Sequence, residues 1–214
     1  MKVTDFSATG NSAVAKIDMP MATLTMTYTL MADGAVIVRQ QMEPKKDAKE
    51  TWLFRYGMQL QMPRLYNHVK YYGRGPHENY SDRNSSEFLG VYESSVSEQY
   101  YPYVRPQESG NHTDVRWFSV VDQQTGRGLQ FRSSAPFECS ALPYLVEGLD
   151  AGPRKEHSWG QHSGDLVERP LTQLHIQQRQ MGLGCVNSWD GWPEKPYMPP
   201  LQSYDFTYMI SPLR

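Results

Sequence analysis

Two carboxylates, Glu78 and Asp82, lie four residues apart in a segment that is otherwise rich in turn-forming residues. Paired carboxyl groups can act as a general acid and a general base or nucleophile in hydrolysis. The amide of Asn79 and the guanidinium of Arg83 offer them another use, because such groups pair with one another and with loop backbone. We favour this structural role for Glu78, Asn79, Asp82 and Arg83, and for Glu108, and assign no catalytic residue.

Histidines and cysteines are the next candidates for chemistry. His157 and His162 are five residues apart, which does not place them on one helix face, and no His-Glu-x-x-His motif occurs. Packed or solvated histidines are therefore favoured over a metal site. The separation of Cys139 and Cys185 fits no zinc pattern. Two buried free thiols are the preferred interpretation, with a single disulfide as the alternative. The six histidines are His68, His77, His112, His157, His162 and His175.

Trp189 and Trp192 lie in a stretch rich in glycine and proline. The indole face is a large, rigid surface, and the C–H groups of a sugar ring are apolar enough to pack on it. The neighbours Gly182, Gly184 and Pro193 favour an exposed loop over a core position, which stays the alternative. Trp189 is the main candidate for binding and Trp192 the second.

The sequence pattern predicts that the elements that position these residues are β-strands. Residues 24–30 alternate apolar and threonine side chains, and Asp33-Gly34 predicts a tight turn into a return strand. Residues 171–180 fit neither a strand nor a short helix cleanly, and nowhere is there a sustained helical stripe. The fold class is all-β, with antiparallel hairpins packed as a sandwich. Other predicted strands are 52–60, 68–72, 115–121, 129–132 and 204–210, and predicted loops are 43–50, 76–110 and 151–165.

Length and charge restrict the class of protein further. The 214 residues suit a single β-sandwich domain, in which residues 1–20 are either a linker or the first strand. The net charge is −2 and the basic residues form no stripe, so nucleic acid is not an expected partner. No apolar run is long enough to cross a membrane, and residues 1–10 do not resemble a signal peptide. Cytoplasmic and periplasmic locations both stay open.

Four segments in a fixed order make the sequence more specific. Residues 73–83 (GRGPHENYSDR) are followed by 101–111 (YPYVRPQESGN), by 114–117 (DVRW), and by the pair 181–184 (MGLG) and 188–189 (SW). These segments resemble the C-terminal, small-chain domain of glycoside hydrolase family 2 β-galactosidases. The resemblance is dense from about residue 62 to residue 192 and looser elsewhere.

The resemblance implies a large antiparallel supersandwich similar to galactose mutarotase. It also implies that the catalytic glutamates lie in a separate barrel, that divalent or monovalent cations would bind in that barrel, and that this chain holds no cofactor. Trp189 would sit on a loop that reaches the mouth of the active site. Cys185 and Val186 depart from the family pattern, which has glycine and an acidic residue there, so the path of this loop is open. The implied partners are the remaining domains, a galactoside substrate and a possible second copy of the enzyme.

Three functions compete at this point. The first is a non-catalytic domain that contributes Trp189 to the active-site rim of a β-galactosidase and supports its structure. The second is an autonomous galactoside-binding module, which the abundance of aromatic residues favours. The third is a mutarotase-type epimerase, which would require a histidine and a glutamate converging in one pocket.

Overall fold

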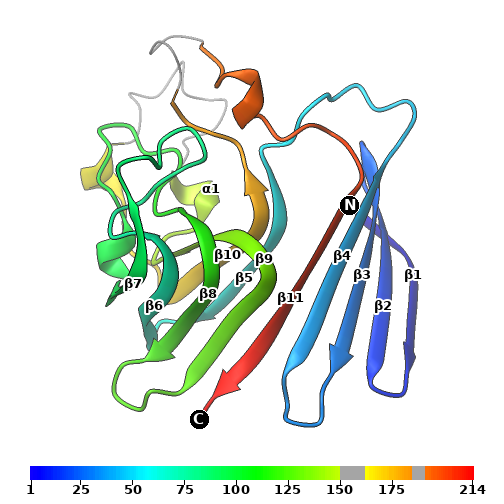
Figure 1. Ribbon diagram of the computed structural model, residues 1–214, viewed down its shortest axis with the longest axis horizontal. Helices are drawn as coiled ribbons and strands as arrows, with labels where there is room; N and C mark the ends of the chain where they lie inside the picture. Colours follow the sequence, from blue (N-terminus) through cyan, green and yellow to red (C-terminus); the bar gives the residue numbers. More distant parts are fainter. Residues whose placement is uncertain (150–161, 185–190) are drawn as a thin grey trace.

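The computed structural model describes residues 1–149, 162–184 and 191–214. Trp189, Cys185, Val186 and His157 lie outside these described residues. Within them, no helix is long and apolar enough to cross a membrane. Figure 1 shows the chain as an assembly of long antiparallel strands with irregular connections gathered at one end.

Eleven strands belong to one hydrogen-bonded network in the described part of the chain. Short helical turns interrupt the connections: η1 (Ser97–Gln99), α1 (Val146–Leu149), η3 (Ser163–Asp165) and η4 (Lys195–Tyr197). The strands are β1 (Lys2–Thr9), β2 (Ser12–Asp18), β3 (Ala22–Leu30), β4 (Val36–Pro44), β5 (Arg55–Pro63), β6 (Tyr66–Gly75), β7 (Phe88–Ser95), β8 (His112–Asp122), β9 (Gly128–Leu142), β10 (Leu171–Gln180) and β11 (Tyr204–Leu213).

Strand β9 joins two groups of strands. Its first residues pair with β11, which continues through β4, β3 and β2 to β1, whereas residues 138–142 pair with β10, which continues to β5. The opposite edge of β9 pairs with β8 along both halves, and β8 leads to β6 and β7. In Figure 1, β1–β4 lie side by side at one end of the molecule, while β5–β10 gather at the other. All of these pairings are antiparallel, as the sequence predicts.

The apolar core lies between the two groups of strands. Tyr56 on β5 stacks on Tyr204 of β11, with 5.0 Å between ring centroids, although β5 and β11 are not paired. Tyr208 of β11 likewise reaches the sulfur of Met58 on β5. Packing between unpaired strands is what a sandwich requires, because each sheet buries one apolar face against the other. The predicted antiparallel sandwich is therefore confirmed.

Strand β10 is buried on both faces, which explains why its sequence fits no simple template. Leu174 and Ile176 enter the apolar core. The alternate side chains Gln173, His175 and Gln177 are also buried, but they face a polar layer beneath the long connections. A strand covered on both sides loses the alternation of apolar and polar residues from which an exposed strand is predicted. The strand interpretation is confirmed and the helical one is wrong.

Several predicted boundaries are wrong. Residues 76–110 were expected to be loop, yet they contain β7, an edge strand in which none of the residues is buried and the apolar ones do not alternate with polar ones. Strand β9 runs ten residues beyond the predicted end at Arg132, because its exposed middle portion is polar. Strand β4 extends to Pro44, inside the predicted loop 43–50. Residues 2–18, for which a linker was one option, form the paired strands β1 and β2.

Candidate functional site

Asp82 fixes the start of the segment that carries Trp189. Its carboxylate accepts hydrogen bonds from the backbone N–H groups of Leu183, at 3.1 Å, and Gly184, at 2.5 Å. The backbone N–H of Gly182 donates to the carbonyl of Tyr197 at 2.9 Å. A Cβ atom on Gly182 would lie 2.4 Å from Cγ of Asp82, so glycine is needed for this close approach. The two most specific motifs of the sequence therefore meet in space.

An exposed cluster of aromatic rings fixes the other end of the same segment. The ring of Trp192 lies 5.7 Å from that of Trp52 and 6.2 Å from that of Phe54, centroid to centroid. All three rings are exposed to solvent. Phe54 also accepts a backbone hydrogen bond from Met181 at 2.8 Å, which places this aromatic cluster beside the segment that Asp82 holds. Trp189 itself lies outside the described residues, between these two anchored points in the sequence.

Glu78 lies at the centre of a network that holds the loops together. Its side chain is only 6% exposed. It accepts hydrogen bonds from Arg83 at 2.7 Å, from the backbone N–H of Gly110 at 2.6 Å and from the hydroxyl of Ser109 at 3.2 Å, and it pairs closely with the hydroxyl of Tyr103. Burial and this carboxylate raise the pKa of Tyr103 to about 12. These donors hold the Glu78 carboxylate in place as an acceptor within the loop network.

Asn79 and its neighbours complete the network. The fully buried amide of Asn79 donates to the carbonyls of Arg74 and His77 and accepts from the backbone and hydroxyl of Thr113. A buried amide has to satisfy its donors and acceptor, and this one does. Arg83 lies over the rings of two tyrosines, at 5.4 and 5.8 Å from their centroids. Glu108 instead forms an ion pair with Arg55 at the start of β5.

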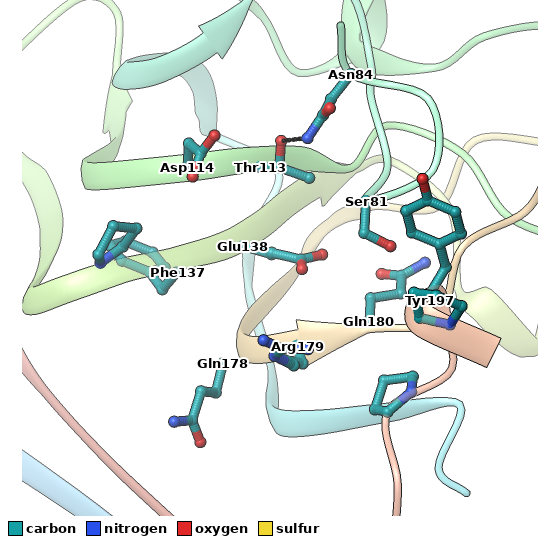
Figure 2. A pocket seen from close by; sticks show the side chains of 13 residues that line it. Ser81, Asn84, Thr113, Asp114, Phe137, Glu138, Gln178, Arg179, Gln180 and Tyr197 are labelled. Atoms are coloured by element: carbon teal, nitrogen blue, oxygen red, sulfur yellow. Dashed lines mark hydrogen bonds between the residues drawn. The ribbon is translucent and has the colours of Figure 1, made fainter. Parts of the chain in front are cut away.

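A cavity lies directly beneath these loops (Figure 2). Its volume is about 350 Å³, and its wall includes the carboxyl of Glu138, a residue that the sequence does not single out. Glu138 accepts a hydrogen bond from the side chain of Asn111 at 3.0 Å. Burial raises the pKa of Glu138 to about 7, while the hydrogen bonds from Asn111 and from the backbone of Gln180 oppose that change. Glu138 lies in a strand that mixes polar and apolar residues, so the burial of its carboxyl could not be predicted from the sequence pattern.

The histidines are not gathered at this cavity. Nε2 of His112 donates to the side-chain oxygen of Gln99 at 2.6 Å, and Nδ1 of His175 shares a hydrogen bond with the hydroxyl of Ser140 at 3.0 Å. Burial lowers the pKa of His112 to about 4 and that of His175 to about 3, so both rings are neutral at pH 7. Within the described residues, no three metal-binding side chains come together. Cys139 is a buried free thiol, and Cys185 lies outside the described residues.

Comparison with known proteins identifies the family. Residues 2–210 match the family described as β-galactosidase small chain. The chain is 35% identical to a β-galactosidase of Priestia megaterium over 92% of its own length and 18% of that protein's length. It is 33% identical to a β-galactosidase of Streptococcus thermophilus, over 88% of this chain and 17% of the relative. The chain thus spans less than a fifth of the length of these relatives.

Two solved structures overlap with nearly the whole chain. A galactose mutarotase related enzyme from Lactobacillus acidophilus has a TM-score of 0.49 at 9% identity, over 99% of this chain and 72% of that one. An aldose epimerase homologue from C. elegans has a TM-score of 0.48 at 10% identity, over 98% of this chain and 68% of that one. At these low sequence identities, both similarities are similarities of the backbone structure alone. The family match over residues 2–210 and the 35% identity to a β-galactosidase show that the chain belongs to the β-galactosidase small-chain family.

Proposed function

We propose that this chain is the non-catalytic C-terminal domain of a larger β-galactosidase that hydrolyses terminal β-D-galactosides with retention. The relatives that support this proposal are named β-galactosidases and are far longer than the chain. Retaining hydrolysis needs two carboxyl groups about 5 Å apart that are free to transfer a proton and to attack the sugar. Glu78 and Asp82 are engaged by several donors instead. The catalytic carboxylates would therefore come from the rest of the enzyme.

In this proposal Trp189 contributes an aromatic face to the rim of the active site. One observation supports it most directly: the chain enters the segment with Trp189 at Gly184, held by Asp82, and leaves it at Trp192, held by the aromatic cluster. The described residues on both sides of residue 189 are therefore held by contacts with the rest of the domain. The remaining domains are the expected partners, and the galactoside is the expected ligand.

The exposed aromatic cluster favours a second candidate, an autonomous galactoside-binding module. Trp52, Phe54 and Trp192 present three rings to solvent, and Trp192 follows Trp189 closely in the sequence. Aromatic faces of this kind suit the apolar C–H groups of a pyranose. This candidate predicts that the chain binds galactose without the rest of the enzyme. A mutarotase-type epimerase has less support, because no histidine is among the described residues that line the cavity at Glu138.

An activity and binding assay separates these functions. We expect the chain alone to leave a β-galactoside intact, even when circular dichroism shows that it is folded, and the assembled enzyme to hydrolyse it. Turnover by the folded chain alone that persists through further purification would contradict the proposal. Calorimetric titration of the chain with galactose tests the second candidate, and Trp192→Ala serves as the variant that should abolish any such binding. Acceleration of galactose anomer exchange by the chain would instead support the epimerase.

A further inference from the structure

Strands β1–β3 form a sheet with one polar face and one apolar face. Residues directly opposite each other on antiparallel strands point to the same side of the sheet. The polar face carries an ion pair between Asp5 and Lys16 and the four threonines of β3. The opposite side, which we call the apolar face, gathers two rows of apolar side chains, Val3–Ile17–Leu24 and Phe6–Ala15–Met26.

The apolar face is covered at one end only. Across β4 its two rows continue to Tyr204 and Phe206 of β11, which are 8% and 3% exposed within the core. At the other end, on β1, Val3 is 60% exposed and Phe6 is 65% exposed. Figure 1 shows β1–β3 on the side of β4 that points away from β5–β10. An apolar face that runs from the core into solvent indicates that the opposing layer of the sandwich is too short to cover it.

The opposing layer ends at β5. Both layers begin at β9: one continues for five strands, β11, β4, β3, β2 and β1, and the other for two, β10 and β5. Tyr56 and Met58 of β5 contact β11 across the core, so the cover over the longer layer stops near there. In the described part of the chain β5 pairs with β10 alone. Its other edge therefore offers backbone N–H and C=O groups to a further strand, next to the uncovered part of the apolar face.

We propose that one or more β-strands from the rest of the larger β-galactosidase pair with the free edge of β5 and cover the apolar face of β1–β3. This inference rests on the proposed function, because it requires the chain to be part of a longer enzyme. Strand addition of this kind uses backbone hydrogen bonds along the edge and alternate side chains toward the sheet that is covered. The added strand would carry apolar side chains on the side that meets Phe6 and Ile17.

Other occupants of the apolar face fit less well. Residues 2–210 match the β-galactosidase small-chain family, so β1–β5 belong to that family's domain, while the chain spans only 18% of a relative's length. Polypeptide linked to the domain is present at a millimolar effective concentration, which favours it over a second copy of the enzyme. A galactoside is a poor match, because the six residues of the two rows carry no side chain that could bond to its hydroxyl groups.

The test uses the assembled enzyme. Its structure, from crystals or from electron cryomicroscopy, should show a strand of the remaining polypeptide paired with β5 and apolar side chains against Phe6. Phe6→Asp should lower the midpoint of thermal unfolding by on the order of 5 °C, because it would bury an unpaired charge. Ser7→Asp is the matched control, since Ser7 is exposed and is the next residue of the same strand, on the polar face. It should shift the midpoint by less than about 2 °C.

Several outcomes would overturn the proposal. They are an exposed Phe6 in the assembled enzyme, a β5 edge without an added strand, a cover supplied by a second copy or by other residues of this chain, and equal effects of the two substitutions. The structure of the native enzyme keeps the test decisive if Phe6→Asp fails to fold. Hydrolysis by the folded chain alone would contradict the proposed function, whereas an active assembled enzyme with Phe6 exposed would contradict only this inference.

Discussion

At the scale of single residues, the buried carboxylate of Glu78 accepts hydrogen bonds from several donors at once. Its oxygens bind Arg83 in the connection between β6 and β7, and Tyr103, Ser109 and Gly110 in the connection between η1 and β8. The motif of residues 73–83 therefore carries a structural network, and its Asp82 anchors the backbone of Leu183 and Gly184. This anchor, Asp82, lies only four positions after Glu78 in the sequence.

The first prediction concerns this network. Glu78→Ala should lower the free energy of unfolding by about 3 kcal/mol, because it leaves several buried donors without an acceptor. Urea denaturation followed by circular dichroism measures the change. Glu93→Ala is the matched control, because Glu93 forms an ion pair with Lys70 in which both side chains are at least half exposed. The control should change stability by less than about 1 kcal/mol. Equal effects of the two substitutions would contradict this account of Glu78.

A second residue-scale prediction follows from Glu138, whose pKa is raised from 4.5 to about 7 by burial. The folded protein then holds a proton at pH values where the unfolded chain has lost it. The resulting stability is fully present below pH 4.5 and is lost as the pH rises through about 7. Asp114 reinforces the raised pKa and Arg179 opposes it.

The measurement compares the free energy of unfolding of the native chain with that of Glu138→Gln between pH 4.5 and pH 8. Relative to the variant, the native chain should lose stability with rising pH, by at most about 3 kcal/mol. Other groups titrate in both proteins, so the difference isolates Glu138. Parallel curves, or a native chain that gains stability relative to the variant, would show that the carboxyl is not buried as described.

At the scale of elements, the segment that begins at residue 181 depends on a tight contact between two loops. Gly182 and Gly184 both approach the carboxylate of Asp82 closely, and a side chain on Gly182 would occupy its space. Gly182→Ala and Asp82→Ala should therefore each displace the same segment and lower kcat/KM of the assembled enzyme for a β-galactoside. Since each removes the same contact, the double variant should be little worse than the more damaging single variant.

A double-mutant cycle on kcat/KM checks this coupling. Gly148→Ala is the control, because a Cβ atom there meets nothing within 4 Å. It should leave kcat/KM nearly unchanged. If the effects of Gly182→Ala and Asp82→Ala multiply as independent changes, the two loops do not act as one unit.

The same scale shows how far the sequence could predict the fold. Strand β3 follows directly from alternating residues, and β11 from the alternation after residue 204. Strand β10 gives no clear pattern because a polar layer covers its second face, and β7 gives none because its apolar residues are interrupted by Gly90 and do not alternate with polar ones. Of the site, the motif residues Glu78 and Asp82 were recognisable, whereas Glu138 depends on strand pairings that join residues far apart in the sequence.

At the scale of the whole molecule, two groups of strands share the long strand β9 and leave the connections that bear the motifs at one end (Figure 1). The anchored loops, the aromatic cluster and the cavity are therefore supported by a single sandwich. This arrangement suits a domain that presents loops to the rest of an enzyme, since a rigid scaffold fixes where loops begin and end. In the proposed function, the remaining domains cleave the glycosidic bond, and this domain contributes part of the rim of the active site.

The measurement that tests this account most directly is the steady-state hydrolysis of a β-galactoside by the assembled enzyme carrying Trp189→Ala. Phe88→Ala is the control, because Phe88 is an exposed aromatic residue on the edge strand β7. If Trp189 contributes to the active-site rim, its removal should lower kcat/KM by about tenfold or more, equivalent to at least about 1.4 kcal/mol of transition-state stabilisation. The control should keep the native value. A Trp189→Ala enzyme that is folded and hydrolyses the substrate at the native kcat/KM would contradict the central claim.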